Sequence, residues 1–154
     1  MIELTIAAAE SPDPVLDLLL LADPQEALVR EYVADGKLYT ATWDNLTVGV
    51  FVLLPIDDDL WELKNIAVSP EWQGKGVGKR LLQEAIAAAK ELGAKSLEAG
   101  TGNSSLDQLA YYQKAGFRMD RIAKNFFTLN YDEPIFENGI QCRDMVFLKL
   151  NLEG

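Results

Sequence analysis

The sequence predicts a mixed α/β domain, and three observations favour this fold class. The 154 residues are 49% hydrophobic, which suits one domain with a full core. Segments with the two-residue alternation of strands are interleaved with segments of helical spacing. An apolar strand also runs through Val68 into a turn that contains Gly74, Gly76 and Gly78, and the chain continues directly into a helix. We therefore expect a single domain that spans residues 1–154.

The first half of the chain predicts strands on either side of a helical pair. Ile2–Ile6 alternates apolar and polar residues like a first strand. One helix is expected to start at Asp13, before Pro14, and a second to run from Pro24 to Gly36. A hairpin about Asp44-Asn45 and one further strand follow. These strands are expected at Lys37–Trp43, Leu46–Leu54 and Leu60–Val68.

The second half continues the alternation of helices and strands. Its predicted helices are Gly78–Leu92, with Gly93 as the C-cap, and Leu106–Ala115. A short strand, Lys95–Ala99, lies between them. We expect the remaining chain to be rich in strands, at Ile122–Tyr131 and Cys142–Leu152.

Composition excludes several classes of site. The chain has no histidine, so Ser-His-Asp and Cys-His hydrolases and histidine metal centres are excluded. Cys142 is the single cysteine, which rules out an internal disulfide and a multi-cysteine metal site. No secretory leader is evident, and the apolar run Leu18–Leu21 is too short to cross a bilayer. We expect a cytoplasmic protein without a metal and without a membrane partner.

The net charge of −10 is unevenly distributed. Residues 1–60 hold 12 acidic residues against two basic ones, whereas residues 61–154 hold 12 of each. An acidic chain is a poor candidate for nucleic-acid binding, which depends on clustered lysine and arginine. The acidic part either serves solubility or attracts a cationic ligand.

The glycine turn has the composition of an anion-binding site. Glycines let a ligand approach the backbone, and the N-terminus of the following helix offers N–H groups and the positive end of the helix dipole. The spacing excludes a Walker loop, which would need glycine at Ser69 and serine or threonine at Gly76. It also excludes a Rossmann fingerprint, which needs the wider spacing G-x-G-x-x-G. The alternative is a turn with a purely structural role.

The neighbourhood of this turn carries a family resemblance. Gln73-Gly-Lys-Gly76-Val-Gly78 is similar to an acyl-CoA signature, Gln/Arg-x-x-Gly-x-Gly/Ala. Leu63–Pro70 is similar to the strand that precedes that signature, and Ala110–Phe117 is similar to a helix end of the pattern A-x-x-F-Y-x-x-x-G-F. Together these motifs cover about residues 60–120, in the expected order. The chain thus resembles the GCN5-related N-acetyltransferase (GNAT) family.

The resemblance implies a three-layer fold in which helices flank a largely antiparallel central sheet. The sheet is expected to splay between Leu60–Val68 and Lys95–Ala99 and to form a cleft for acetyl-CoA, the acyl donor. Asn103 is assigned to CoA through this resemblance, although it could instead cap the following helix. The positions that the resemblance assigns to CoA are Ile66, Ala67, Val68, Gln73, Gly74, Lys75, Gly76, Val77, Gly78, Lys79 and Asn103.

Two residues are candidates for catalysis. Tyr112 resembles the family's tyrosine acid, which protonates the departing thiolate; its alternative role is that of a packed aromatic. Glu62 resembles the glutamate that several relatives use as a base. It lies four residues before Ile66 and shares its face if the strand is regular, whereas a bulge would break that inference. Glu98 and Asp57–Asp59 are weaker candidates, and Asp57–Asp59 suits a solvated turn better than a metal site.

We therefore expect an N-acetyltransferase that moves acetyl from acetyl-CoA to a primary amine by direct attack in a ternary complex. The acidity of residues 1–60 favours a cationic acceptor, either a small molecule or a peptide. The alternatives are transfer of another acyl group, a CoA-binding sensor without catalysis, and a nucleotide-binding domain. The strands near the C-terminus are candidates for a homodimer interface.

Overall fold

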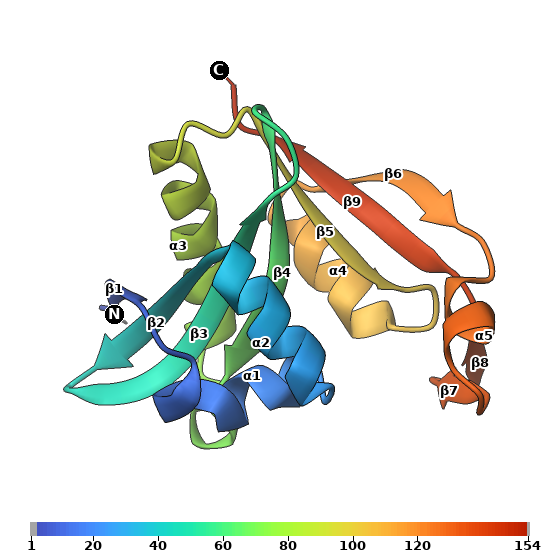
Figure 1. Ribbon diagram of the computed structural model, residues 1–154, viewed down its shortest axis with the longest axis horizontal. Coiled ribbons are helices and arrows are strands. Elements are labelled where there is room, and N and C mark those ends of the chain that lie inside the picture. Colours follow the sequence, from blue (N-terminus) through green and yellow to red (C-terminus); the bar gives the residue numbers. More distant parts are fainter. Residues whose placement is uncertain (1–2, 154) are drawn as a thin grey trace. The chain divides into compact units, whose positions relative to one another are not determined.

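The computed structural model describes residues 3–153 and has the predicted mixed α/β class. The chain divides into two compact units, Met1–Lys95 and Ser96–Gly154. Each unit has its own helices, and its strands pair antiparallel (Figure 1). The single domain expected for residues 1–154 stays a prediction.

A four-stranded antiparallel sheet forms the centre of the first unit, in the order β1-β2-β3-β4. Its strands are β1 (Thr5–Ala9), β2 (Lys37–Trp43), β3 (Leu46–Pro55) and β4 (Leu60–Val68). The last three begin where predicted. β1 begins at Thr5 because its register with β2 starts there, opposite Thr42. Ile2, where that strand was expected to begin, lies outside the described residues.

The turn between β2 and β3 confirms the predicted hairpin. Asp44 and Asn45 both have positive φ, 51° and 64°. A two-residue hairpin of this type requires positive φ at both central positions, and Asn and Asp tolerate it better than most residues.

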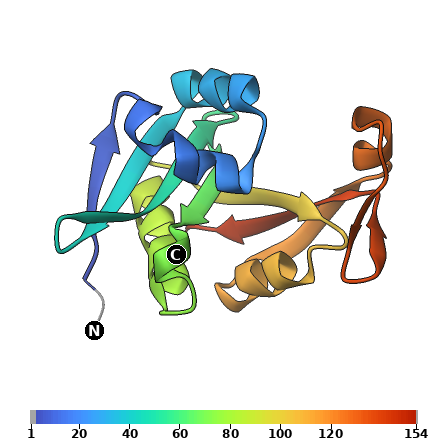
Figure 2. The same ribbon diagram turned by 90° about the horizontal axis from the view of Figure 1, so that it is seen from below.

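Helices cover both faces of this sheet, which gives the three layers that we expected (Figure 2). On one face, Val50 and Val52 of β3 share a buried cluster with Leu19 and Val29. The opposite face lies against α3, because a Cβ at Gly49 would stand 2.8 Å from Leu81 Cδ2. The helices of this unit are a 3-10 turn (Asp13–Val15), α1 (Leu16–Ala22), α2 (Glu26–Asp35), a second 3-10 turn (Pro70–Trp72) and α3 (Val77–Glu91).

The second unit holds a sheet in the order β5-β9-β6. α4 packs against β5, and a separate hairpin of β7 and β8 turns at Asn138-Gly139, where φ is 56° and 74°. Its elements are β5 (Ser96–Gly102), α4 (Leu106–Lys114), β6 (Arg118–Ala123), α5 (Phe126–Asn130), β7 (Ile135–Glu137), β8 (Ile140–Cys142) and β9 (Met145–Asn151).

The prediction of a strand over Ile122–Tyr131 is wrong beyond Ala123. β6 ends at Ala123, and Asn125 takes a left-handed conformation with φ 63° that starts α5. Two hydrogen bonds hold this turn: Asn125 N donates to Asp144 Oδ1 at 2.9 Å and Phe127 N donates to the Arg143 carbonyl at 2.9 Å. The apolar residues of the segment therefore follow a helix that is anchored to the start of β9.

Candidate functional site

The glycine turn joins β4 to α3 through a backbone that only glycine adopts readily. Gly74 and Gly76 have φ of 75° and 85°, and Gly76 is the N-cap of α3. No side chain caps the helix, and no acidic residue lies in its first turn. This helix start instead has Lys75, Lys79 and Arg80 around it. Because cations oppose the dipole at a helix N-terminus, the arrangement suits a bound anion better than it suits helix stability.

Gln73 ties this turn to the end of β4. Its Nε2 donates to the Val68 carbonyl at 3.0 Å, and Ser69 N donates to the Val48 carbonyl at 2.8 Å. Lys75 Nζ lies 5.3 Å from the ring centroid of Trp72, which suits a cation–π contact. The signature glutamine thus has a definite local role, since it holds the turn against the strand.

A β-bulge in β4 separates Glu62 from Ile66. Val52 pairs with Asn65, but the next residue of β3, Leu53, pairs with Leu63, so β4 carries one extra residue there. Directly paired residues share a face of the sheet. Ile66 is paired with Phe51 and lies on the α3 face with Leu63, whereas Glu62 is paired with Leu54 on the opposite face. Glu62 and Ile66 were expected to share a face only if the strand were regular. The bulge reverses the alternation, so they lie on opposite faces.

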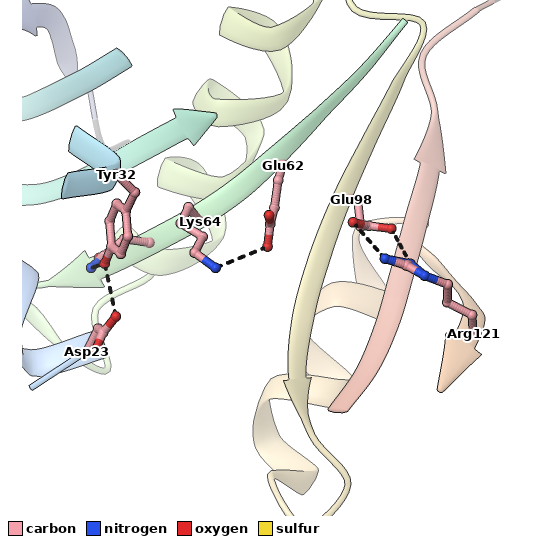
Figure 3. Close-up of polar contacts among 7 residues, drawn as sticks. Asp23, Tyr32, Glu62, Lys64, Glu98 and Arg121 are labelled. Carbon is pink, nitrogen blue, oxygen red and sulfur yellow. Dashed lines mark hydrogen bonds and ion pairs between the residues drawn. The ribbon is translucent and has the colours of Figure 1, made fainter. Parts of the chain in front are cut away.

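The face that holds Glu62 also carries a polar network between β4 and the first two helices. Asn65 Nδ2 donates to the Leu19 carbonyl at 3.0 Å and to Tyr32 Oη at 2.9 Å. Tyr32 Oη in turn donates to Asp23 Oδ2 at 3.3 Å (Figure 3). The Leu19 carbonyl can only accept, which fixes the amide orientation and leaves the buried Asn65 Oδ1 without a partner. The network holds α1 and α2 to β4.

No pattern in the sequence singles out Tyr32 or Lys64. Burial is the main cause that raises the pKa of Tyr32 to about 12, so its hydroxyl stays protonated at neutral pH. Lys64 Nζ lies 3.8 Å from Glu62 Oε2 and 5.8 Å from the Tyr32 ring centroid. The one signal was Asn65, which in a regular strand shares a face with the apolar Leu63 and Ala67 and so predicts a buried amide that needs partners.

Tyr112 lies near the end of α4 and is 5% exposed. Its ring contacts Phe117 and Tyr111, with centroid separations of 5.4 and 5.3 Å. The Phe117 N–H donates to the Tyr112 carbonyl at 3.1 Å, so the helix end positions this tyrosine through the backbone as well. The ring is a packed aromatic, and this packing fixes the position of the hydroxyl.

Asn103 connects the end of β5 to the start of β9. Its Oδ1 accepts from Arg143 N at 2.8 Å and from Asp144 N at 2.9 Å, and its Nδ2 donates to the Gln141 carbonyl at 3.1 Å. The N-cap of α4 is Ser105, so Asn103 is not the cap that was considered as its alternative role. Assignment of Asn103 to CoA stays a prediction.

The weaker base candidates are engaged elsewhere. Glu98 is 4% exposed and pairs with Arg121 through two contacts of 2.7 and 3.4 Å (Figure 3). Asp57 Oδ1 accepts from the N–H groups of Asp59 and Leu60, both at 2.8 Å, as in a tight turn. Glu98 and Asp57 thus each have a structural partner.

Within the first unit the structure brings together the glycine turn, Gln73 and the C-terminal end of β4. Tyr112 and Asn103 lie in the second unit. Among residues 3–153 no group of three or more acidic or cysteine side chains is arranged to hold a metal ion. Over the same residues, no helix has the length and apolar character needed to span a membrane.

Comparisons with known proteins agree with this geometry. A family model described as the acetyltransferase (GNAT) family matches residues 5–117. The uncharacterized N-acetyltransferase YvbK of Bacillus subtilis is 53% identical over 143 residues, which cover 93% of this chain and 92% of YvbK. The range matched by the family model includes Glu62, the glycine turn and Tyr112.

Two solved structures are similar over nearly the whole chain. A Bacillus subtilis acetyltransferase in complex with CoA is 51% identical, with a TM-score of 0.93 and coverage of 98% of this chain and 100% of its own. A GNAT family acetyltransferase from Elizabethkingia anophelis with acetyl-CoA bound is 49% identical, with a TM-score of 0.89 and coverage of 96% and 97%. These similarities confirm the predicted fold class.

Proposed function

Because the chain belongs to the GNAT acetyltransferase family, we propose that it transfers the acetyl group of acetyl-CoA to a primary amine, as one domain over residues 1–154. The observation that carries this proposal is the glycine turn before α3. Its helix N-terminus lacks a side-chain cap and has basic residues beside it. Such a turn suits the phosphates of CoA, which two similar structures hold in bound form.

The proposed CoA contacts follow from this turn. The phosphates bind to backbone N–H groups between Gly74 and Lys79, with Lys75 and Lys79 as further donors. The amide-bearing pantetheine arm lies along Ile66–Val68, where backbone groups of a strand can pair with it. Gln73 acts indirectly, because its hydrogen bond to the Val68 carbonyl fixes the geometry between strand and turn.

The reaction needs no covalent enzyme intermediate. The amine nitrogen attacks the thioester carbonyl, the new C–N bond forms, and the C–S bond breaks to release the CoA thiolate. The Tyr112 hydroxyl gives its proton to that thiolate, since a phenol is protonated at neutral pH. Glu62 accepts the proton that the amine loses, directly or through a water molecule.

A cationic acceptor is favoured by charge. Residues 1–60 carry 12 acidic side chains against two basic ones. Asp23 belongs to this acidic part and accepts a hydrogen bond from Tyr32, and Glu62 follows directly beyond it on β4. Such a charge distribution attracts polyamines, aminoglycoside-like amines or basic peptides more strongly than anionic amines.

The test is CoA release from acetyl-CoA, followed with a thiol reagent, against a panel of polyamines, aminoglycosides, amino acids and basic peptides. Amine-dependent release would support an N-acetyltransferase and identify its acceptor class. Faster release from succinyl-CoA or another acyl-CoA would instead support transfer of that acyl group. CoA binding with no release on any amine would support a CoA sensor, and absence of CoA binding would contradict the proposal.

A further inference from the structure

The bulge in β4 has a consequence for the residues around Glu62. In a regular strand, Glu62, Lys64 and Ile66 would share one face, and Leu63, Asn65 and Ala67 would share the other. The extra residue in β4 brings Asn65 to the face of Glu62 and Lys64, as its bonds to Leu19 and Tyr32 require. The bulge therefore joins an acidic and a basic side chain to the polar network that holds α2.

Lys64 lies between Glu62 and this network (Figure 3). Its Nζ is 3.8 Å from Glu62 Oε2 and 5.8 Å from the centroid of the Tyr32 ring. The Glu62 side chain is only 13% exposed, and that of Lys64 is 35% exposed. The Tyr32 ring is fixed in turn by Asn65 and Asp23, so Lys64 rests on a rigid support.

We infer that Lys64 is a positioning residue for Glu62: its ammonium orients the carboxylate and keeps it ionised, so that Glu62 can accept the proton of the attacking amine. This inference rests on the proposed function. It also rests on contact geometry, because an opposite charge within about 4–6 Å favours the charged form of a carboxylate, most strongly where water is partly excluded.

The charges around Glu62 agree with this role. Tyr32, on α2, is neutral at physiological pH because burial is the main cause that raises its pKa to about 12. Asp23 accepts a hydrogen bond from Tyr32 Oη and adds negative charge on the far side of the ring. The Lys64 ammonium lies beside the Glu62 carboxylate and has the opposite charge.

The experiment compares Lys64→Met and Lys64→Arg with the wild type, using acetyl-CoA and the best amine of the panel. We expect Lys64→Met to lower kcat by about fivefold near neutral pH and to move the acid limb of the kcat/KM profile upward by about one pH unit. Lys64→Arg keeps the charge and should retain the wild-type profile. KM for acetyl-CoA should not change in either variant.

A matched ion pair in the same unit provides the control. Lys95 Nζ lies 3.7 Å from Asp59 Oδ1, and both side chains are more than half exposed. Lys95→Met removes a cation at nearly the same separation and should leave the pH profile unchanged. In a Glu62→Gln background, adding Lys64→Met should neither move the acid limb nor lower the rate further, because the carboxylate on which Lys64 acts is gone.

The outcomes separate the two proposals. A wild-type pH profile in Lys64→Met, or an equal shift in Lys95→Met, would overturn the positioning role while amine-dependent CoA release still supports the proposed function. Wild-type activity in Glu62→Gln would also overturn it, since there would be no base to position. No amine-dependent release by the wild-type protein would overturn the proposed function, and this inference with it.

Discussion

The two ends of β4 support different chemistry by different means. At its C-terminal end the chain enters the glycine turn, where the backbone itself provides the proposed phosphate site and positive φ at Gly74 and Gly76 sets its shape. Near its N-terminal end the proposed base, Glu62, depends on the side chains of Lys64 and Asn65, the second of which a bulge brings to its face. The turn should therefore be sensitive to backbone substitutions, whereas the Glu62 end should respond to changes in charge and hydrogen bonding.

The largest effect is expected from a substitution in the glycine turn. Gly76→Val places a β-branched residue at φ 85°, a conformation that such residues rarely adopt, and adds a side chain where the ligand approaches the backbone. We expect CoA affinity to fall by about 100-fold or more, measured by isothermal titration calorimetry.

Gly93 provides the control for backbone strain. It lies at the other end of α3, has φ 86°, and has no atom within 4 Å of an added Cβ. Gly93→Val should cost similar stability but leave CoA binding unchanged. If both variants lost affinity equally, strain alone would explain the loss and the phosphate site would be contradicted.

A second prediction separates binding from catalysis. Tyr112→Phe keeps the packed ring but removes the hydroxyl that protonates the thiolate, so kcat should fall by about 100-fold while CoA affinity stays unchanged. Steady-state kinetics and titration calorimetry measure the two effects. Tyr111→Phe, which removes a hydroxyl one residue away, should keep full activity. If CoA affinity in Tyr112→Phe fell by as much as kcat, this division of roles would be contradicted.

The contrast between the ends of β4 also explains what could be predicted from the sequence. Positive-φ positions have a local signature, so the glycine turn and the Asp44-Asn45 hairpin were predicted correctly. Helix α3 was predicted because apolar periodicity over 15 residues is a strong signal.

The parts that were missed depend on contacts between distant residues. The bulge in β4 arises from its pairing with β3 and reverses the face of Glu62, which no pattern within β4 reveals. α5 forms over an apolar segment because Asp144 and Arg143 anchor its first turn. Asn103 looks like a helix cap in sequence, yet it binds the start of β9, about 40 residues further on. Such partners become visible only in the folded chain.

A third prediction concerns the stability of the Glu62 end. Asn65→Leu removes the donors to the Leu19 carbonyl and Tyr32 Oη and leaves these groups buried, which should lower the free energy of unfolding by about 1–3 kcal/mol. Asn65→Asp should cost more, because a carboxylate would face the Leu19 carbonyl, itself only an acceptor. Chemical denaturation measures both. Greater stability in Asn65→Asp than in Asn65→Leu would contradict the assigned amide orientation.

The smallest effect is expected from a side-chain substitution in the glycine turn, which measures how much the Gln73 side chain contributes to CoA affinity. Gln73→Ala removes the hydrogen bond to the Val68 carbonyl but leaves every backbone N–H of the turn in place. A single hydrogen bond of this kind is worth about 0.5–1.5 kcal/mol, so CoA affinity should fall by about 2–12-fold. Gln83→Ala, on the exposed side of α3, should not change it. A loss of CoA affinity as large as that of Gly76→Val would contradict this indirect role. It would indicate that the Gln73 side chain contacts CoA directly, because the loss of one hydrogen bond within the turn accounts for only about 2–12-fold.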